Sequence, residues 1–462
     1  MRLQKLCVLL GLVTLGLSGA CGDDDVKNTP DPRLIEGGGV GDGAINGRVN
    51  IHVINGDTDE AIVGATILIG EPDETAMEGE TDSDGLFTLD DGSLSGPTTV
   101  TVVADGYVTS TWFGANGANM TIPLNEVRAA GTTPTVAKAT LTGTIAGWDS
   151  LPDPPANHFV IAIIAYSQTD ELGGDENNIE QPGGGQGLPP NACVAVADTR
   201  ECAWSLVSRT GKVAISATIL DFDNKGTKDE SDDVVTTVGY AVQTGVTVVA
   251  NQNQSGLSLT MIADVDLTTV DMNLAAIPSA FDSSIAFVGL DLGTDGILQL
   301  GNYDSANPAP VLVPELTGML SSGTYRGTAL AANEDDEDDD NPITAVLKTG
   351  ITDLSNGITF GPWLAQPSSL KLTDGEYSFT PVNDASYHIV ALRDSNDNQV
   401  WEFALLDGRT AFTVPTVDPD PRPSGSLDLT VTAFEGTVDL TDFAIDDLAD
   451  TLERLSIARE TL

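Results

Sequence analysis

The sequence predicts a mainly β protein made of tandem antiparallel β-sandwich modules, followed by a short C-terminal helix. Apolar and polar residues alternate with a period of two along many short segments, which is typical of strands with one buried face. Turn-forming residues separate these segments, and the chain contains 48 Gly and 24 Pro. A helical spacing of apolar residues occurs only at the end of the chain. The hydrophobic content of 40% is enough to form cores.

Residues 1–20 have the form of a secretory signal peptide. Arg2 and Lys5 give a positively charged start, residues 6–17 form an apolar run, and residues 18–20 are small. The apolar run is shorter than the roughly 20 residues that a helix needs to cross a bilayer. We therefore expect the leader to be removed and the mature chain to have no membrane span.

Cys21 follows the small residues directly. This arrangement resembles the lipobox of bacterial lipoproteins, in which a diacylglycerol is attached to the Cys and cleavage makes that Cys the new N-terminus. The family usually has Leu three residues before the Cys, whereas in this chain Ser18 holds that position and Leu17 lies one residue further away. The resemblance implies a lipid anchor on Cys21, and the alternative is cleavage at an ordinary signal-peptidase site.

The other cysteines favour the lipidated form. Cys7 leaves with the leader, and Cys193 and Cys202 can form a disulfide with each other. An unmodified Cys21 would then be an odd exposed thiol in an oxidising compartment. We expect the Cys193–Cys202 pair to brace the fold, because catalytic redox pairs are more often spaced as CxxC.

The formal net charge of −49 limits the partners of the chain. Such a surface repels nucleic acid and anionic lipid, so nucleic-acid binding is excluded. The acidity keeps an exported protein soluble. The expected partners are a membrane, reached through the lipid anchor, and an envelope protein or a glycan.

Residues 21–43 are predicted to form a flexible tether. Three consecutive Asp residues begin it, two Pro residues follow, and Gly37, Gly38 and Gly39 come near its end. The acidic cluster after a lipidated Cys also resembles the surface-export signals of some bacterial lipoproteins. We expect an outer-membrane lipoprotein, and the sequence leaves open whether it faces the periplasm or the cell surface.

Residues 44–126 are predicted to form the first β-sandwich. Val49, Ile51 and Val53 alternate with polar residues, which places His52 on the polar face of a strand. Turns rich in Asn, Asp and Gly separate this strand from those that follow. The spacing of the turns predicts a small antiparallel sandwich.

The order of motifs in this module, GRV, IVGATILI, TDSDGLFTL and TVVADGY, resembles the carboxypeptidase regulatory-like domain, a transthyretin-like sandwich related to the repeats of collagen-binding adhesins. The resemblance implies a fold and an accessory role in spacing or presenting other domains. A zinc carboxypeptidase would need a His and a Glu three residues apart. None of His52, His158 and His388 is followed by Glu at that distance, so the peptidase half is absent.

Residues 139–264 are predicted to form a second sandwich-like domain. Within it, Asp221, Asp223, Asp229 and Asp232 reproduce the carboxylate spacing of a calcium loop. Lys225 stands where a ligand oxygen should point. A solvated acidic loop is therefore the favoured interpretation, and structural calcium is retained as the alternative.

Residues 283–437 are predicted to form a third β-rich domain, and residues 441–462 a C-terminal helix. Trp363 and Trp401 in the third domain belong either to its core or to a glycan-stacking face. In the tail, Leu448, Leu452 and Leu455 recur at helical spacing, with acidic residues near the start and Arg near the end.

No catalytic motif is found in the sequence. GxSxG, a phosphate-binding GxxxxGKS loop and HExxH are all missing, and the three His occur singly. We therefore expect a lipid-anchored envelope protein with a non-catalytic structural, adhesion or ligand-presenting role. The alternative is a glycan-binding or glycan-active surface protein that uses a cleft in the third domain, since carboxylate pairs are spatial and escape motif searches.

Overall fold

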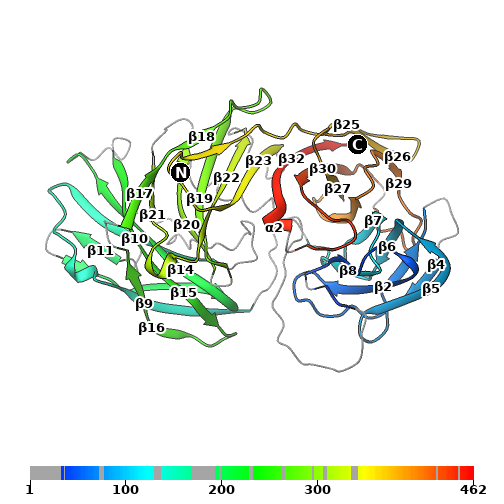
Figure 1. Cartoon of the computed structure of the whole chain (residues 1–462), viewed down its shortest axis with the longest axis horizontal. Helices are drawn as coiled ribbons and strands as arrows, with labels where there is room; N and C mark the ends of the chain where they lie inside the picture. Colours follow the sequence, from blue (N-terminus) through cyan, green and yellow to red (C-terminus); the bar gives the residue numbers. More distant parts are fainter. Residues whose placement is uncertain are drawn as a thin grey trace.

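The computed structural model is mainly β and contains several sheets (Figure 1). The structure describes residues 33–35, 37–71, 77–128, 137–167, 193–196, 199–227, 233–262, 266–293, 296–304, 310–333, 342–422, 425–445 and 448–462. Among these residues, no helix is long and apolar enough to cross a bilayer.

The largest sheet has twelve strands and joins segments that are far apart in the sequence. Strands from the first predicted module form one end of it, and strands from the third predicted domain, together with one strand from the C-terminal segment, form the rest. The two groups meet where β7 runs parallel to β28. In sheet order the strands are β20 (Ile297–Asp304), β19 (Ser283–Asp291), β22 (Thr324–Ala332), β23 (Ile343–Ile351), β32 (Leu452–Thr461), β30 (Asp428–Gly436), β27 (Tyr387–Arg393), β28 (Gln399–Leu405), β7 (Thr109–Ala115), β6 (Thr98–Val103), β3 (Thr66–Ile69) and β4 (Met77–Glu80).

A five-stranded sheet packs against one end of the large sheet. Val49, Ile51 and Val53 of this smaller sheet are fully buried in the same hydrophobic cluster as Ile67 and Val102 of the larger one. The two layers therefore form a β-sandwich, in agreement with the predicted architecture of this segment. The five strands in order are β31 (Phe443–Ala444), β1 (Gly39–Gly41), β8 (Asn119–Leu124), β2 (Asn46–Asn55) and β5 (Leu86–Ser95).

The predicted tether 21–43 ends earlier in the structure than the sequence predicts. Ile35 and Val40 are buried, and β1 pairs with β8 on one side and β31 on the other. A Cβ on Gly39 would lie 2.2 Å from the carbonyl oxygen of Phe443. The glycine run therefore permits close packing of a strand, whereas its composition predicts a flexible linker.

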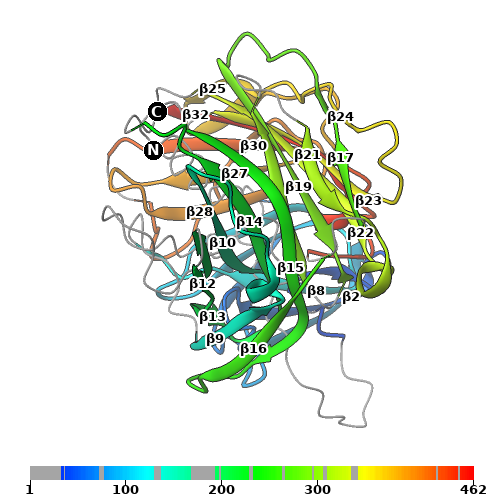
Figure 2. The same cartoon turned by 90° about the vertical axis from the view of Figure 1, so that its left-hand side faces the viewer.

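An eight-stranded sheet is formed by the second predicted domain (Figure 2). The strand at one end, β13, also contacts β10, so the sheet curls around its own core of Trp148, Tyr166 and Trp204. The strands in order are β12 (Thr199–Glu201), β11 (Cys193–Val196), β10 (His158–Ser167), β14 (Gly211–Asp223), β15 (Val234–Val248), β16 (Gln254–Met261), β9 (Lys138–Ala146) and β13 (Trp204–Arg209).

Smaller sheets and single turns complete the described chain. Most neighbouring strands are antiparallel as predicted, but β2–β8, β7–β28, β9–β16 and β18–β24 are parallel. The remaining elements are β17 (Leu267–Val270) with β21 (Val311–Pro314), β18 (Met272–Leu274) with β24 (Ile358–Phe360), β25 (Ser368–Thr373) with β26 (Glu376–Thr380) and β29 (Ala411–Thr413), and the helical turns η1 (Trp148–Ser150), η4 (Gly318–Leu320) and α2 (Leu448–Thr451).

The predicted C-terminal helix 441–462 is wrong. Among the described residues of this segment, only the single turn α2 is helical, and the residues after it form β32 between β23 and β30. Residues 455–458 of this strand are all buried, because both of its faces are covered. A strand buried on both faces has no period of two, so its apolar spacing could be mistaken for that of a helix.

Candidate functional site

Several predicted site residues lie outside the described part of the chain. Cys21, Asp229 and Asp232 are among them, so lipidation and the calcium hypothesis stay predictions. Cys193, Cys202, Asp221 and Asp223 are described. Among the described residues, no group of three or more His, Cys, Asp or Glu side chains is arranged to hold a metal ion.

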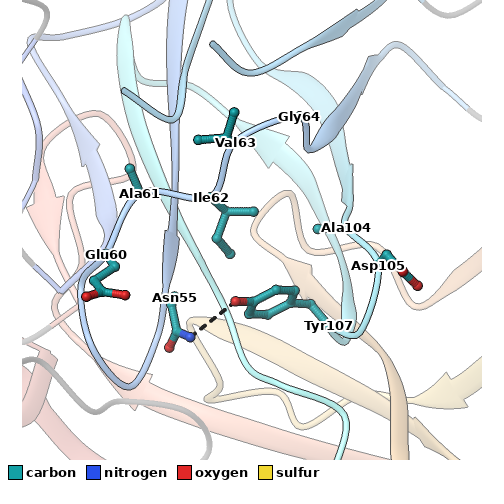
Figure 3. Close-up of a pocket in the computed structure, with 9 residues that line it drawn as sticks. All are labelled: Asn55, Glu60, Ala61, Ile62, Val63, Gly64, Ala104, Asp105 and Tyr107. Atoms are coloured by element: carbon teal, nitrogen blue, oxygen red, sulfur yellow. Dashed lines mark hydrogen bonds between the residues drawn. The ribbon is translucent and has the colours of Figure 1, made fainter. Parts of the chain in front are cut away.

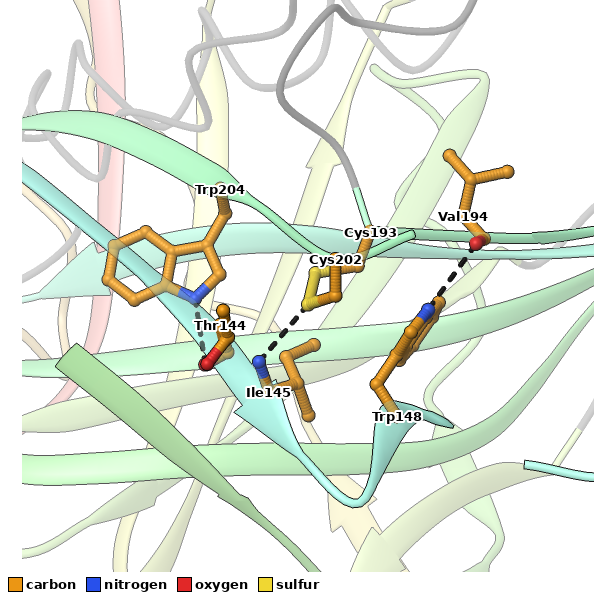
Figure 4. The surroundings of a disulfide bond; sticks show 7 residues. All are labelled: Thr144, Ile145, Trp148, Cys193, Val194, Cys202 and Trp204. Carbon is orange, nitrogen blue, oxygen red and sulfur yellow. Dashed lines mark hydrogen bonds between the residues drawn. A yellow bond between two sulfur atoms is a disulfide. The ribbon is translucent and has the colours of Figure 1, made fainter. Parts of the chain in front are cut away.

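Cys193 and Cys202 form the predicted disulfide (Figure 4). It joins β11 to the turn that precedes β13, and the backbone N–H of Ile145 on β9 donates a hydrogen bond of 3.1 Å to Sγ of Cys202. Two buried indoles flank it: Trp148 Nε1 donates to the carbonyl of Val194, and Trp204 Nε1 to that of Thr144. This apolar setting, with Cys193 buried and Cys202 partly buried, suits a structural bridge better than a redox centre.

The first two carboxylates of the predicted calcium loop are engaged by cationic or ionisable side chains. His158 Nδ1 lies 2.9 Å from Asp221 Oδ2, and its Nε2 lies 3.7 Å from Asp223 Oδ2. Lys225 donates to Asp223 through both its ammonium group and its backbone N–H, and these hydrogen bonds lower the pKa of Asp223. The ammonium group of Lys225 therefore lies beside the Asp223 carboxylate, where it would compete with a bound calcium ion. The sequence also placed Lys225 at a ligand position of the loop.

The two tryptophans of the third region differ in their surroundings. Trp401 is fully buried, and its Nε1 donates a hydrogen bond of 3.0 Å to the hydroxyl of Thr111. Trp401 therefore belongs to the core and offers no face to a glycan. Trp363 is partly buried against a second core cluster, and its Nε1 donates to the carbonyl of Ala275.

A surface hollow of about 380 Å³ lies at one end of the first sandwich (Figure 3). Ile62 and the ring of Tyr107 face each other across it, and Asn55 Nδ2 donates a hydrogen bond of 3.3 Å to the Tyr107 hydroxyl. Glu60 and Asp105 stand at its opposite ends. These groups can contact a small neutral or cationic molecule, but they include no nucleophile with an adjacent base.

A second polar group was missed by sequence reasoning. Glu402 on β28 accepts a hydrogen bond of 3.0 Å from Gln399 Nε2, and burial raises the pKa of its carboxyl. Nearby strands carry Arg393 and Arg459, both of which pair with Asp397. Arg393, Asp397, Gln399 and Glu402 lie close together in the β27–β28 hairpin, and only Arg459 is brought in from a distant part of the sequence, by the register of β32 beside β30.

His388 is buried on β27, with 5% of its surface exposed. Its ring lies 5.0 Å from that of Phe379. Within the described part of the chain, neither ring nitrogen has a hydrogen-bond partner. Burial lowers the pKa of His388 to about 4, so the imidazole is neutral in the folded protein at neutral pH.

Comparison with known families and curated proteins gives no match: no family model matches the chain, and no curated protein matches it.

Solved structures similar to the chain share little sequence with it. The Bacillus anthracis TIE protein is 12% identical over 62% of this chain, with a TM-score of 0.15, and the match spans 45% of that protein's chain. A putative carbohydrate-binding protein from Bacteroides uniformis is 12% identical, covering 41% of this chain and 98% of its own, with a TM-score of 0.15. The major pilin subunit of Bacillus cereus is 14% identical, covering 68% and 97%, also with a TM-score of 0.15. Similarity at this level carries no argument about function.

Proposed function

We propose that the chain is a lipid-anchored protein of the bacterial cell envelope with a non-catalytic structural or adhesion role. In this proposal, Cys21 carries the lipid and the β body stands away from the membrane on the segment that follows. The outer membrane is the expected location. Two or three acyl chains on one Cys would hold the protein firmly.

The main support for the proposal is the position of β1, which lies near the start of the described chain and pairs with two other strands. The first described strand, β1, is clamped between β8 and β31, and Arg33 just before it pairs with Asp42 and Asp442. A pull on the N-terminus would therefore reach the first sandwich and the C-terminal segment at once. The twelve-stranded sheet would then distribute this load across the body. Such an arrangement suits a protein that resists force.

A non-catalytic role is supported by the surroundings of the histidines. His52 and His388 are buried, and His158 is engaged by Asp221. Among the described residues, the contacts of His158 and His388 are with Asp221, Asp223 and Phe379, and these include no Ser or Cys nucleophile.

Cell fractionation tests the proposal. The full chain should sediment with membranes, whereas a Cys21→Ala variant should be strongly depleted from the mature, membrane-bound form. Protease treatment of intact cells then tells the two membrane faces apart.

Because Trp401 is buried and Trp363 packs against a core, we expect no retention of the protein on a glycan array. Selective binding of one glycan would favour the lectin-like alternative.

A further inference from the structure

The outer face of β10 is apolar although it lies at the surface. Side chains alternate along a strand, so Phe159, Ile161 and Ile163 point to one face of the sheet while Val160 and Ala162 point to the other. Val160 and Ala162 pack in or against the core of the eight-stranded sheet. Ile163 is 36% exposed, so the opposite row faces outward.

The same face continues across the neighbouring strands β14 and β15. Phe222 lies opposite Phe159 and Val235 in the register, and Leu220 lies opposite Ile161. The rings of Phe159 and Phe222 stack, with their centroids 4.9 Å apart. Val235 is 50% exposed. We call this surface the outer patch, and its residues are Phe159, Ile161, Ile163, Leu220, Phe222 and Val235.

The acidic residues of this region do not interrupt the outer patch. Asp221 and Asp223 alternate with Leu220 and Phe222 along β14, so their side chains leave the opposite face of the sheet. Both are held there by contacts with His158. The six residues of the outer patch therefore carry no charge on a protein with a formal net charge of −49, and the same face continues through Val194 on β11 to the exposed Glu201 on β12.

The other half of this sheet face is already covered by the chain itself. Ser167 and Ala214 continue the rows of the outer patch toward the far ends of β10 and β14. The Ser167 hydroxyl accepts a hydrogen bond of 3.1 Å from the backbone N–H of Ile297 on β20, and a Cβ on Gly296 would come within 2.5 Å of Ala214. One half of the face thus packs against a second sheet, and the outer patch is its uncovered continuation.

We propose that the outer patch is a self-association surface on which two copies of this chain pack face to face. The covered half shows that this face accepts an apolar sheet as its partner, and a two-fold arrangement would set two uncharged patches against each other. Aromatic pairs such as Phe159–Phe222 are typical of the centre of such interfaces. The acidic side chains that repel each other in the two copies are not among the patch residues.

The size of the outer patch sets the strength of the association. The patch lies on three strands about 4.8 Å apart and spans about five residues along β10 at a rise of about 3.3 Å, so it covers at most roughly 240 Å² of plane. A stable complex usually buries about 800 Å² on each partner. The dimer is therefore weak, and it strengthens with salt because added ions screen the repulsion between the copies.

Sedimentation of the full chain over a range of concentrations tests the proposal. We expect a monomer–dimer equilibrium that shifts at least tenfold toward the dimer when NaCl is raised from about 0.05 M to about 0.5 M, where the Debye length falls to roughly 4 Å. A double variant, Ile163→Asp with Val235→Asp, should weaken the association at least tenfold. Met319→Asp is the matched control, because Met319 is an exposed apolar residue (54%) on η4 outside the patch.

Crosslinking in intact cells gives a second readout that does not need the purified protein. Ile163→Cys should yield a covalent homodimer with a thiol-specific crosslinker, while Met319→Cys and the unchanged chain should not. The proposal is overturned if the chain stays monomeric at about 1 mM in high salt, or if the patch variants associate as well as the unchanged chain. Equal crosslinking from both introduced Cys residues would also overturn it.

Discussion

His388 couples the stability of the fold to pH through a single side chain. The imidazole is neutral when buried, with a pKa of about 4 against an ordinary value of 6.5. In the unfolded chain it regains the ordinary value, so the unfolded state binds more protons between these two pH values. Its contribution to stability is complete above pH 6.5 and is lost as the pH falls toward 4.

The first prediction concerns a His388→Leu variant. At pH 4.5 the unchanged protein should have lost about 2.5 kcal/mol through this residue, at about 1.4 kcal/mol for each pKa unit. The variant should lack this loss, because Leu does not titrate. Urea unfolding at pH 7 and pH 4.5 measures the difference. Parallel pH dependence of the two proteins would show that His388 is not buried in its neutral form.

The second prediction concerns the disulfide. Replacing both Cys193 and Cys202 by Ser should lower the free energy of unfolding by about 2 to 3 kcal/mol, because the short ring no longer restricts the unfolded chain. Thermal unfolding of the double variant, compared with the unchanged protein before and after reduction, measures this loss. If reduction leaves the melting temperature of the unchanged protein the same, the bridge does not brace the fold.

Single residues were predictable where the chemistry is local. The pairing of Cys193 with Cys202 followed from cysteine counting, whereas the hydrogen bonds from Lys225 to Asp223 were not predicted, since the sequence indicated only that Lys225 stands at a ligand position of the loop. His52 was predicted on a polar strand face, but it is buried in the structure. No sequence pattern indicated the raised pKa of the partly buried Glu402, because that depends on which strands become its neighbours.

At the scale of elements, β1 and β32 were the two segments misjudged from the sequence. Gly37 to Gly39 have the composition of a linker, yet they lead into β1 and are closely packed against neighbouring residues. The apolar residues of β32 have helical spacing, yet the segment fills the gap between β23 and β30. In both cases the deciding partner is distant in the sequence, so local patterns could not identify it.

The third prediction tests the role of β1. Gly39→Val should destabilise the protein by about 1 to 3 kcal/mol, because the side chain collides with the Phe443 carbonyl and Gly39 has a φ of +132°. Gly92→Ala is the matched control, because a Cβ at Gly92 meets no atom within 4 Å. Chemical denaturation measures both. Equal stability of the two variants would mean that β1 is not clamped.

At the scale of the whole molecule, the described chain is held together by contacts between segments that are far apart in the sequence. β7 pairs with β28, and the Thr111 hydroxyl on β7 contacts both Trp401 Nε1 and the hydroxyl of Thr101, at 3.0 Å each. The mainly β class was predictable from periodicity. The sequence predicted separate tandem modules, whereas one sheet in the structure contains strands from both the first and the third of them.

The fourth prediction uses Thr111→Val, which keeps the shape of the side chain but leaves Trp401 Nε1 buried without an acceptor. The cost should be about 1 to 3 kcal/mol. Hydrogen exchange should increase in both β6 and β28, since the hydroxyl joins them through β7, while β14 should be unaffected. Thr373→Val, at an exposed site, is the control. Faster exchange confined to β6 would contradict a shared sheet.

The central claim is that a lipid on Cys21 holds this body at the membrane, and palmitate labelling of growing cells tests it most directly. We predict that labelled palmitate enters the unchanged chain and a Cys7→Ala variant, whose substitution lies in the leader, but not a Cys21→Ala variant. Equal labelling of the Cys21→Ala variant, or no labelling of any of the three, would contradict the claim.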